Sequence, residues 1–410
     1  MANTKMLLLS YCFPPVASPE SFVTAKTMGG LRDVDIDVIA AEPSNFRENA
    51  DYSLVDYVAE RFSSVELLQA DFLRSVVLSF NRLPLRPDRF VLLNRLAYLR
   101  AKEKLEKQKF DVLFTRSQYH SSHLVGLKLK RKFPGTPWVA SFSDPWVSNP
   151  YEKRVPILSN WSDRTSRKVV EFADYLIFPT KGIQDIFCEN NPNLDVFAKS
   201  KVVPHSYDEA LYPNKSISND SRLKFAYFGN FYGARRLEPI LEALSFLVRS
   251  GEISERNFVL QIYSSGFDAL GILLDGCSEL KGIVEVKKNV EHLDALARMQ
   301  DADILLLVEA PSKEPSIFLP SKLVDYIGAH RKIFSITSEG VSAELTREFK
   351  GYCANVDDKI DICRNIRKSL SDHKSGIIGD LRSNKRGRRF EVGCVSDMLM
   401  EVLKIVIQGK

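Results

Sequence analysis

Short, continuous apolar runs separated by helical stretches recur along this chain and constrain its fold most strongly. Six runs lie in the first half of the sequence, at residues 6–11, 36–40, 112–115, 138–141, 175–178 and 202–204. Five more lie in the second half, at residues 225–228, 258–263, 284–286, 304–308 and 333–336. Most runs are apolar throughout, which is typical of parallel strands covered on both faces. The sequence therefore predicts an α/β protein with two doubly wound parallel sheets.

A polar stretch between the two series predicts a domain boundary. Residues 204–222 are rich in Ser, Asn, Asp and Pro, which is typical of a linker, and 410 residues suffice for two domains. We expect an N-terminal domain over residues 1–212 and a C-terminal domain over residues 213–388. A closing helix over residues 389–410 should return to the N-terminal domain. Ligands are expected in a cleft between the sheets, at the carboxyl ends of the strands.

The sequence gives no sign of export, membrane spanning or metal binding. No apolar run reaches the ~18 residues of a membrane-spanning helix, and the N-terminus lacks the pattern of a signal peptide. The six cysteines are scattered without a C-x-x-C pair, which argues against disulfides and a zinc site. We therefore expect a cytoplasmic protein without a bound metal.

Positive charge is concentrated in one part of the chain. The net charge is +5, but residues 61–132 contain 16 Lys and Arg against 6 Asp and Glu, interleaved with large apolar residues. This pattern is found in amphipathic helices that lie on anionic membranes. It is also found in ordinary solvated helix faces. Both interpretations remain open from the sequence.

Polar residues follow the expected strands of the first domain. Ser18 is placed to cap a helix with Ser21 in its first turn, which would direct backbone amides toward the cleft. Ser143 and Asp144 follow the run at 138–141, where the carboxylate would orient a substrate hydroxyl or form an Asx turn. His123 lies three residues after another histidine, in a polar turn expected to line the cleft or cap a helix.

The second domain carries two motifs suited to a phosphorylated ligand. Gly229 and Asn230 follow the run at 225–228, and a small residue there lets a ligand approach the backbone. Arg235 and Arg236 come next, and together they would clamp a diphosphate.

A helix start near residue 320 supplies the other motif. Ser321 and Lys322 lie in its first turn, and Asp325 follows at a spacing of three from the lysine. The lysine would contact a phosphate and the carboxylate would accept ribose hydroxyls. The alternative is a local ion pair on a surface helix.

Taken in order, these motifs resemble the retaining GT-B glycosyltransferases of family 4, of the bacterial surface-polysaccharide type. The segments that carry the resemblance include YCFPPVASPES, FSDPW, YFGNFYGARR and FLPSKLVDYIG. The resemblance implies two Rossmann-like domains facing across a cleft, with the nucleotide-sugar donor held mainly by the second. Asp325 would bind the donor ribose, and Asn230 stands near where the family has a basic residue. Ile317 occupies the first acidic position of the family's E-x7-E motif, so Glu314 or Glu309 would take that role.

The resemblance implies a retaining, metal-independent hexosyltransferase without a cofactor. It would move a sugar from a nucleotide diphosphate sugar to a glycan acceptor, lipid-linked, in cell-surface polysaccharide biosynthesis at the inner face of the membrane. Asp144, Arg235 and Glu314 are the expected catalytic residues, and nucleic acid is not an expected partner. A nucleotide-sugar epimerase or hydrolase on the same fold is one alternative, and a degenerate partner subunit is another. The sugar, the base, the acceptor and the linkage remain open.

Overall fold

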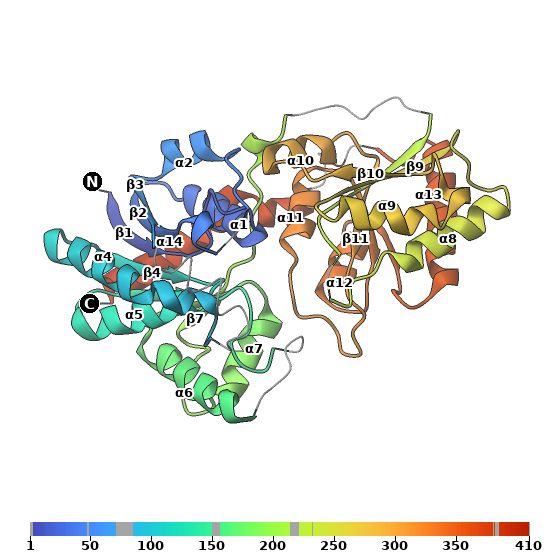
Figure 1. The fold of residues 1–410 in the computed structure, drawn as a ribbon. Helices are drawn as coiled ribbons and strands as arrows, with labels where there is room; N and C mark the ends of the chain where they lie inside the picture. The colour runs from blue at the N-terminus through green and yellow to red at the C-terminus, as the bar shows by residue number, and fades with distance from the viewer. Residues whose placement is uncertain are drawn as a thin grey trace. The chain divides into compact units, whose positions relative to one another are not determined.

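The computed structural model describes residues 3–46, 49–70, 85–149, 156–213, 221–231, 233–379, 381 and 385–409 (Figure 1). The chain forms two compact α/β units. The first contains Met1–Ser206 together with Val392–Lys410, and the second contains Tyr207–Glu391. No helix within the described residues is long and apolar enough to cross a membrane.

The first unit is built on a seven-stranded sheet with the order β3-β2-β1-β4-β5-β6-β7. Its strands are β1 (Thr4–Leu9), β2 (Val34–Ala41), β3 (Ser64–Leu68), β4 (Val112–Arg116), β5 (Trp138–Ser141), β6 (Tyr175–Phe178) and β7 (Ser200–Val202). Every neighbouring pair is parallel, β4, β5 and β6 are buried along their whole length, and β1 is buried over its last four residues. The chain order reverses between β1 and β4, so the doubly wound fold has its switch point there.

Helices cover both faces of this sheet. They are α1 (Pro19–Gly29), α2 (Val55–Arg61), α4 (Asn94–Lys107), α5 (Ser121–Lys132), α6 (Pro156–Phe172), α7 (Lys181–Asn190) and α14 (Val392–Gln408). Helices α4, α5 and α6 lie side by side, and α14 packs against α1 (Figure 1). The expected closing helix is thus part of the first unit, although it comes from the end of the chain.

The second unit contains a six-stranded parallel sheet with the order β10-β9-β8-β11-β12-β13. Its strands are β8 (Leu223–Phe228), β9 (Phe258–Ser264), β10 (Val284–Lys288), β11 (Ile304–Val308), β12 (Lys332–Ile336) and β13 (Tyr352–Ala354). Its helices are α8 (Glu238–Arg249), α9 (Phe267–Asp275), α10 (His292–Met299), α11 (Ser321–Gly328), α12 (Val341–Glu348) and α13 (Lys359–Lys374).

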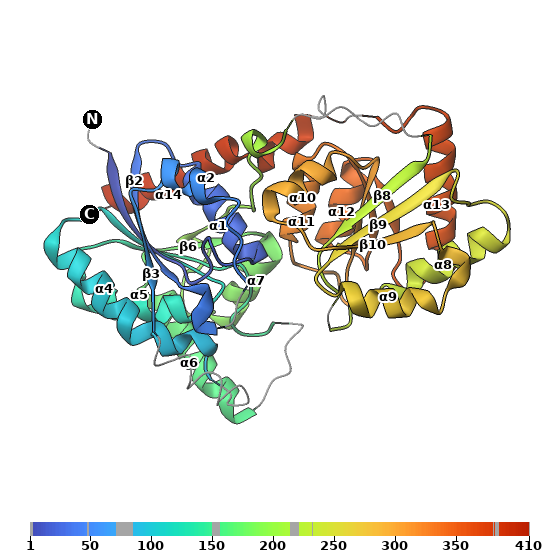
Figure 2. The same cartoon turned by 45° about the horizontal axis from the view of Figure 1, so that its top comes forward.

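Two apolar clusters cover the two faces of the second sheet. Residues of α8, α9 and α13 form one cluster, and residues of α10, α11 and α12 form the other (Figure 2). The switch point lies between β8 and β11, because the chain order reverses there.

The eleven strands predicted from apolar runs are all present, with ends shifted by a few residues. The run at 202–204 is shifted most, because the strand β7 ends at Val202. Two strands were not predicted. Strand β3 has the sequence SVELL and is mostly half-exposed, and β13 has only three residues, so neither forms a buried apolar run.

A glycine in α5 allows close packing in the core of the first unit. A Cβ atom at Gly126 would lie 2.6 Å from ring atoms of Trp138, which is completely buried. The indole Nε1 donates a hydrogen bond to Thr115 Oγ1 at 2.8 Å, so the ring has little freedom to move.

We expect Gly126→Ala to lower the free energy of unfolding by about 1–3 kcal/mol, because the added methyl group overpacks this contact. Gly135→Ala is the matched control, since a Cβ there would have no atom within 4 Å. Chemical denaturation of both variants measures the effect. Equal stability of the two variants would contradict this packing argument.

Candidate functional site

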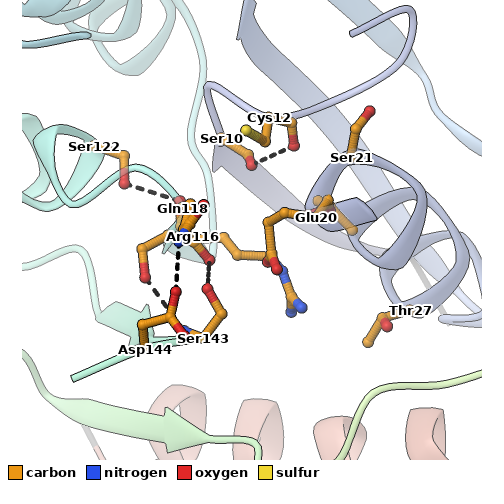
Figure 3. Close-up of polar contacts among 12 residues, drawn as sticks. Ser10, Cys12, Glu20, Ser21, Thr27, Arg116, Gln118, Ser122, Ser143 and Asp144 are labelled. Atoms are coloured by element: carbon orange, nitrogen blue, oxygen red, sulfur yellow. Dashed lines mark hydrogen bonds and ion pairs between the residues drawn. The ribbon is translucent and has the colours of Figure 1, made fainter. Parts of the chain in front are cut away.

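The switch point of the first sheet carries a buried ion pair. Ser18 caps α1 by accepting a hydrogen bond from the Ser21 amide at 3.2 Å, which fixes the first turn that contains Glu20. The carboxylate Oε1 of Glu20 lies 2.9 Å from Nε of Arg116, the last residue of β4 (Figure 3). The two side chains are only 12% and 7% exposed. The fold thus brings together a carboxylate and a guanidinium that are 96 positions apart in the sequence.

Burial changes the protonation of Glu20. Desolvation raises the pKa of its carboxyl group to about 7, and this outweighs the opposing effect of Arg116. The nearby carboxylate of Asp144 raises this pKa further. Glu20 therefore changes charge near neutral pH, which is typical of groups that exchange protons with a substrate.

Asp144 and Ser143 lie in the same group of side chains. Gln118 donates its side-chain amide to Asp144 Oδ2 at 2.5 Å (Figure 3). The hydroxyl of Ser143 donates to the Ser117 carbonyl at 2.8 Å, which ties the loop after β5 to the end of β4. Two predicted residues, Ser143 and Asp144, are therefore placed beside Glu20. These carboxylates offer acceptors to the hydroxyls of a substrate.

Two other predicted residues of the first domain lie in the core. His123 has no exposed surface; its Nδ1 pairs with Thr115 Oγ1 at 2.8 Å and its ring packs on Phe142. Burial holds the pKa of His123 well below its ordinary value, so the ring is neutral. Ser21 is also completely buried. A histidine three residues after another fits a buried helix face as well as a polar surface turn. The structure places His123 on the buried face of α5.

A buried histidine adjoins the same site. His205 follows β7, and its pKa is lowered to about 3 by burial and by the positive charges of Arg116 and Lys26. The ring is therefore neutral at physiological pH and is available as a hydrogen-bonding group. The segment VVPHSYD, which contains His205, also resembles family 4, but its proximity to Arg116 depends on the strand order and was not predicted.

The switch point of the second sheet brings Gly229 and Lys322 together. Gly229 follows β8 with φ +126°, and a Cβ atom there would lie 2.8 Å from the ammonium Nζ of Lys322. Lys322 comes from the first turn of α11, and its Nζ lies 4.0 Å from the ring centroid of Tyr227. The glycine is therefore needed both for its backbone conformation and for the approach of the lysine.

Lys322 carries its charge in an unfavourable environment. Burial lowers its pKa well below the ordinary value, and the positive charge of Arg235 lowers it further. Glu309, the residue after β11, opposes this effect. Glu309 is itself buried and accepts a hydrogen bond from Thr337 Oγ1 at 2.5 Å. An anion bound beside Lys322 and Arg235 would compensate two cations that share one nearby carboxylate.

Glu309 is the acidic residue whose charge acts on Lys322, whereas the predicted catalytic residue is Glu314. Glu314 is exposed in the loop between β11 and α11, and its carbonyl accepts from the Ser312 hydroxyl. Farther along this loop, Ser316 is fixed by backbone hydrogen bonds to Glu339 and Val341. The structure thus shows an electrostatic effect on Lys322 for Glu309, and the catalytic role of Glu314 stays a prediction.

The remaining predicted residues of the second domain have different environments. Asn230 ties β8 to β9, because its Oδ1 accepts from the Ser265 amide at 2.9 Å and from two serine hydroxyls. Ser321 begins α11, and Asp325 is buried in the same helix. Arg236 is exposed, in contrast to its neighbour Arg235.

Within the described ranges, no group of three or more His, Cys, Asp or Glu side chains is placed to hold a metal ion.

Comparison with known proteins relates most of the first unit to a family. Residues 30–210 match the model of Glycosyltransferase Family 4, and this segment covers most of the first unit. None of the curated proteins matches the chain by sequence.

Solved structures share the fold over the whole chain. A glycosyltransferase from Rickettsia africae has a TM-score of 0.68 at 12% identity, covering 100% of both chains. HepE from Anabaena, solved with UDP and glucose, has a TM-score of 0.66 at 14% identity, covering 98% of this chain and 100% of HepE. Sucrose-phosphate synthase from Thermosynechococcus elongatus has a TM-score of 0.70 at 13% identity, covering 100% of both chains. These likenesses confirm the predicted fold.

Proposed function

We propose that this chain, a GT-B protein whose N-terminal domain belongs to glycosyltransferase family 4, transfers a sugar from a nucleotide diphosphate sugar to a glycan hydroxyl. The observation that carries the proposal is the group formed by Gly229, Lys322 and Arg235 at the switch point of the second sheet. Two partly buried cations lie close to each other there. They are suited to stabilise the charge that develops on a leaving nucleoside diphosphate.

The donor is proposed to bind through the second unit. The β-phosphate would lie beside Lys322 and Arg235, near the backbone of Gly229, because a residue without a side chain leaves room for it. Asp325 would contact the ribose. UDP is bound by HepE, which has the same fold, so UDP-sugars are the first donors to test.

The acceptor is proposed to bind through the first unit. Glu20 and Asp144 would accept hydrogen bonds from the acceptor hydroxyls, and Glu20 would take up a proton as the new glycosidic bond forms. We propose that the reaction retains the anomeric configuration and that the acceptor is a lipid-linked glycan of cell-surface polysaccharide biosynthesis in the cytoplasm. The segments FSDPW and FLPSKLVDYIG resemble family 4, and this resemblance supports the proposed retention and the proposed acceptor.

No metal or cofactor is proposed to take part. Lys322 and Arg235 supply positive charge where a metal-dependent enzyme would place its cation. Activity should therefore persist in EDTA.

The test is a thermal-shift screen of nucleotide sugars, followed by product analysis with candidate glycan acceptors in the presence and absence of EDTA. The expected result is stabilisation by one class of nucleotide sugar and acceptor-dependent transfer with retention. Release or epimerisation of the sugar from the donor alone would instead indicate the hydrolase or epimerase. Calorimetry without any binding of nucleoside diphosphate would indicate a degenerate subunit.

A further inference from the structure

Helices α5 and α6 present an exposed surface that combines cations with aromatic rings. We call it the α5–α6 face. Its six exposed cationic residues are Lys128, Arg131, Lys132, Arg164, Arg167 and Lys168. Trp161 and Phe172 are 41% and 37% exposed on α6. The guanidinium of Arg131 lies 4.8 Å from the ring centroid of Phe172, which joins the two helices into one surface.

The residues of α6 that form this face follow the helical repeat. Trp161, Arg164, Lys168 and Phe172 are separated by three, four and four positions, so they lie along one side of the helix. The two aromatic rings are therefore about 16 Å apart along the helix axis, with the cations between them. Asp163 and Glu171 are the acidic residues of α6, and α5 has none.

These cations differ from those of the neighbouring helix α4. On α4, Lys102 and Lys107 pair with Glu106 and Glu103, and Arg100 pairs with Glu66. Within the part of the chain that the structure describes, none of the six cations of the α5–α6 face has an ion-pair partner. The membrane surface predicted over residues 61–132 is thus largely neutralised on α4, and residues 71–84 of it lie outside the described residues.

The exposed aromatic rings indicate the kind of partner. Trp161 and Phe172 stay partly exposed among the cations, although such rings bury large apolar areas when they can. Aromatic rings between cations suit the boundary between lipid headgroups and acyl chains, where the rings enter the apolar layer and the cations meet phosphates. A nucleic acid would use the cations but has no need of two rings along one helix.

We propose that the α5–α6 face binds the surface of an anionic phospholipid bilayer. Trp161 and Phe172 enter the interface, and the six cations contact the lipid phosphates. This inference does not rest on the proposed function, because its test measures binding without donor or acceptor.

The test uses the full-length protein with vesicles of phosphatidylglycerol mixed with phosphatidylcholine, and with vesicles of phosphatidylcholine alone. Flotation should show binding to the anionic vesicles that weakens as salt is added. Of the three tryptophans, Trp138 and Trp146 are buried, so a blue shift of tryptophan emission reports the entry of Trp161.

Two double variants that remove the same amount of charge show whether α6 or α4 binds the bilayer. Arg164→Gln with Lys168→Gln should weaken partitioning roughly 30-fold, since each cation near an anionic surface contributes about five- to sixfold. Lys102→Gln with Lys107→Gln on α4 should change it little. Trp161→Ala should reduce flotation while thermal unfolding stays as in the wild type.

Equal losses in the two double variants would overturn the proposal, because the effect would then come from net charge. Equal binding to the neutral vesicles would also overturn it. Tight binding of duplex DNA at the same salt, without a blue shift on vesicles, would show that the face binds nucleic acid instead.

Discussion

Lys322→Met is expected to lower kcat/KM by about 10²–10³-fold, the usual effect of removing one group that stabilises transition-state charge in a buried site. Methionine keeps the length and apolar volume of the side chain but removes the ammonium group. The variant therefore tests the charge of Lys322 near Arg235 and Glu309, and not the packing of α11.

The same variant should be as stable as the wild type or more stable. The pKa of Lys322 is lowered on folding, so the charged form is less favourable in the native state than in the unfolded chain. Removing the charge removes this cost at every pH where the unfolded lysine is protonated. Loss of activity with a retained or raised Tm would separate a functional role from a structural one.

Donor binding should also shift the protonation of Lys322. A diphosphate beside the ammonium group would raise its pKa back toward the ordinary value, so the wild type should take up protons on binding at alkaline pH. Calorimetry in buffers with different ionisation enthalpies measures this uptake. It should be absent in Lys322→Met.

Lys332→Met is the matched control for this prediction. Lys332 is buried, and desolvation lowers its pKa as it does that of Lys322. It lies at the amino end of β12, away from the carboxyl ends where the site is found, and its Nζ donates to the Lys350 carbonyl. Similar losses of kcat/KM in both variants would contradict a specific role for Lys322.

The sequence predicted the residues that belong to one strand end or one helix turn. Asp144 and Lys322 were singled out because polar residues after parallel strands, or in the first turn of a following helix, lie at the ligand-binding edge. The local sequence together with this rule was enough to select these two residues. The structure places both at switch points of their sheets, while their roles stay predictions. The strands were predicted for a similar reason, since most are buried on both faces and read as apolar runs.

Pairs made by distant segments could not be predicted. Glu20 meets Arg116 only because β1 and β4 are neighbours in the sheet, and a single sequence does not give that order. Ile317 occupies the first acidic position of the motif, so the spacing did not choose between Glu309 and Glu314. Only the folded loop shows that the charge of Glu309 acts on Lys322. The spacing of His123 fits a helix face without saying which side of the helix is buried.

Glu20→Gln is expected to lower kcat/KM by about 10²–10⁴-fold at pH 8, the usual range for removing a group that transfers a proton. With a pKa of about 7, the carboxyl of Glu20 is mostly ionised at pH 8 and mostly protonated at pH 6. Wild-type kcat/KM should therefore fall about tenfold per pH unit below pH 7. Glutamine resembles the protonated acid, so the variant should lack this acidic limb.

The pH dependence of the free energy of unfolding tests the pKa of Glu20 independently of activity. Its pKa is raised from 4.5 to about 7 on folding, so the native state binds more protons than the unfolded chain between these values. The contribution of Glu20 to the free energy of unfolding is thus present below pH 4.5 and is lost as the pH rises to 7, by up to about 3 kcal/mol. Relative to Glu20→Gln, wild-type stability should decline across this window and then level off.

Asp88→Asn provides the control for both measurements. Burial raises the pKa of Asp88 to about 6, yet its carboxylate oxygens accept from the Phe90 and Ser121 amides and the Ser121 hydroxyl, which gives it a capping role. This variant should lose stability while its pH–rate profile keeps the acidic limb near pH 7. If Asp88→Asn removed that limb and Glu20→Gln kept it, the proton acceptor would not be Glu20. A carboxylate that contacts the acceptor should remove the acidic limb of the pH–rate profile when it is replaced, without a large loss of stability. A carboxylate that is only buried should lose stability and keep that limb. The pH–rate profiles and the stabilities of the two variants therefore distinguish the two roles.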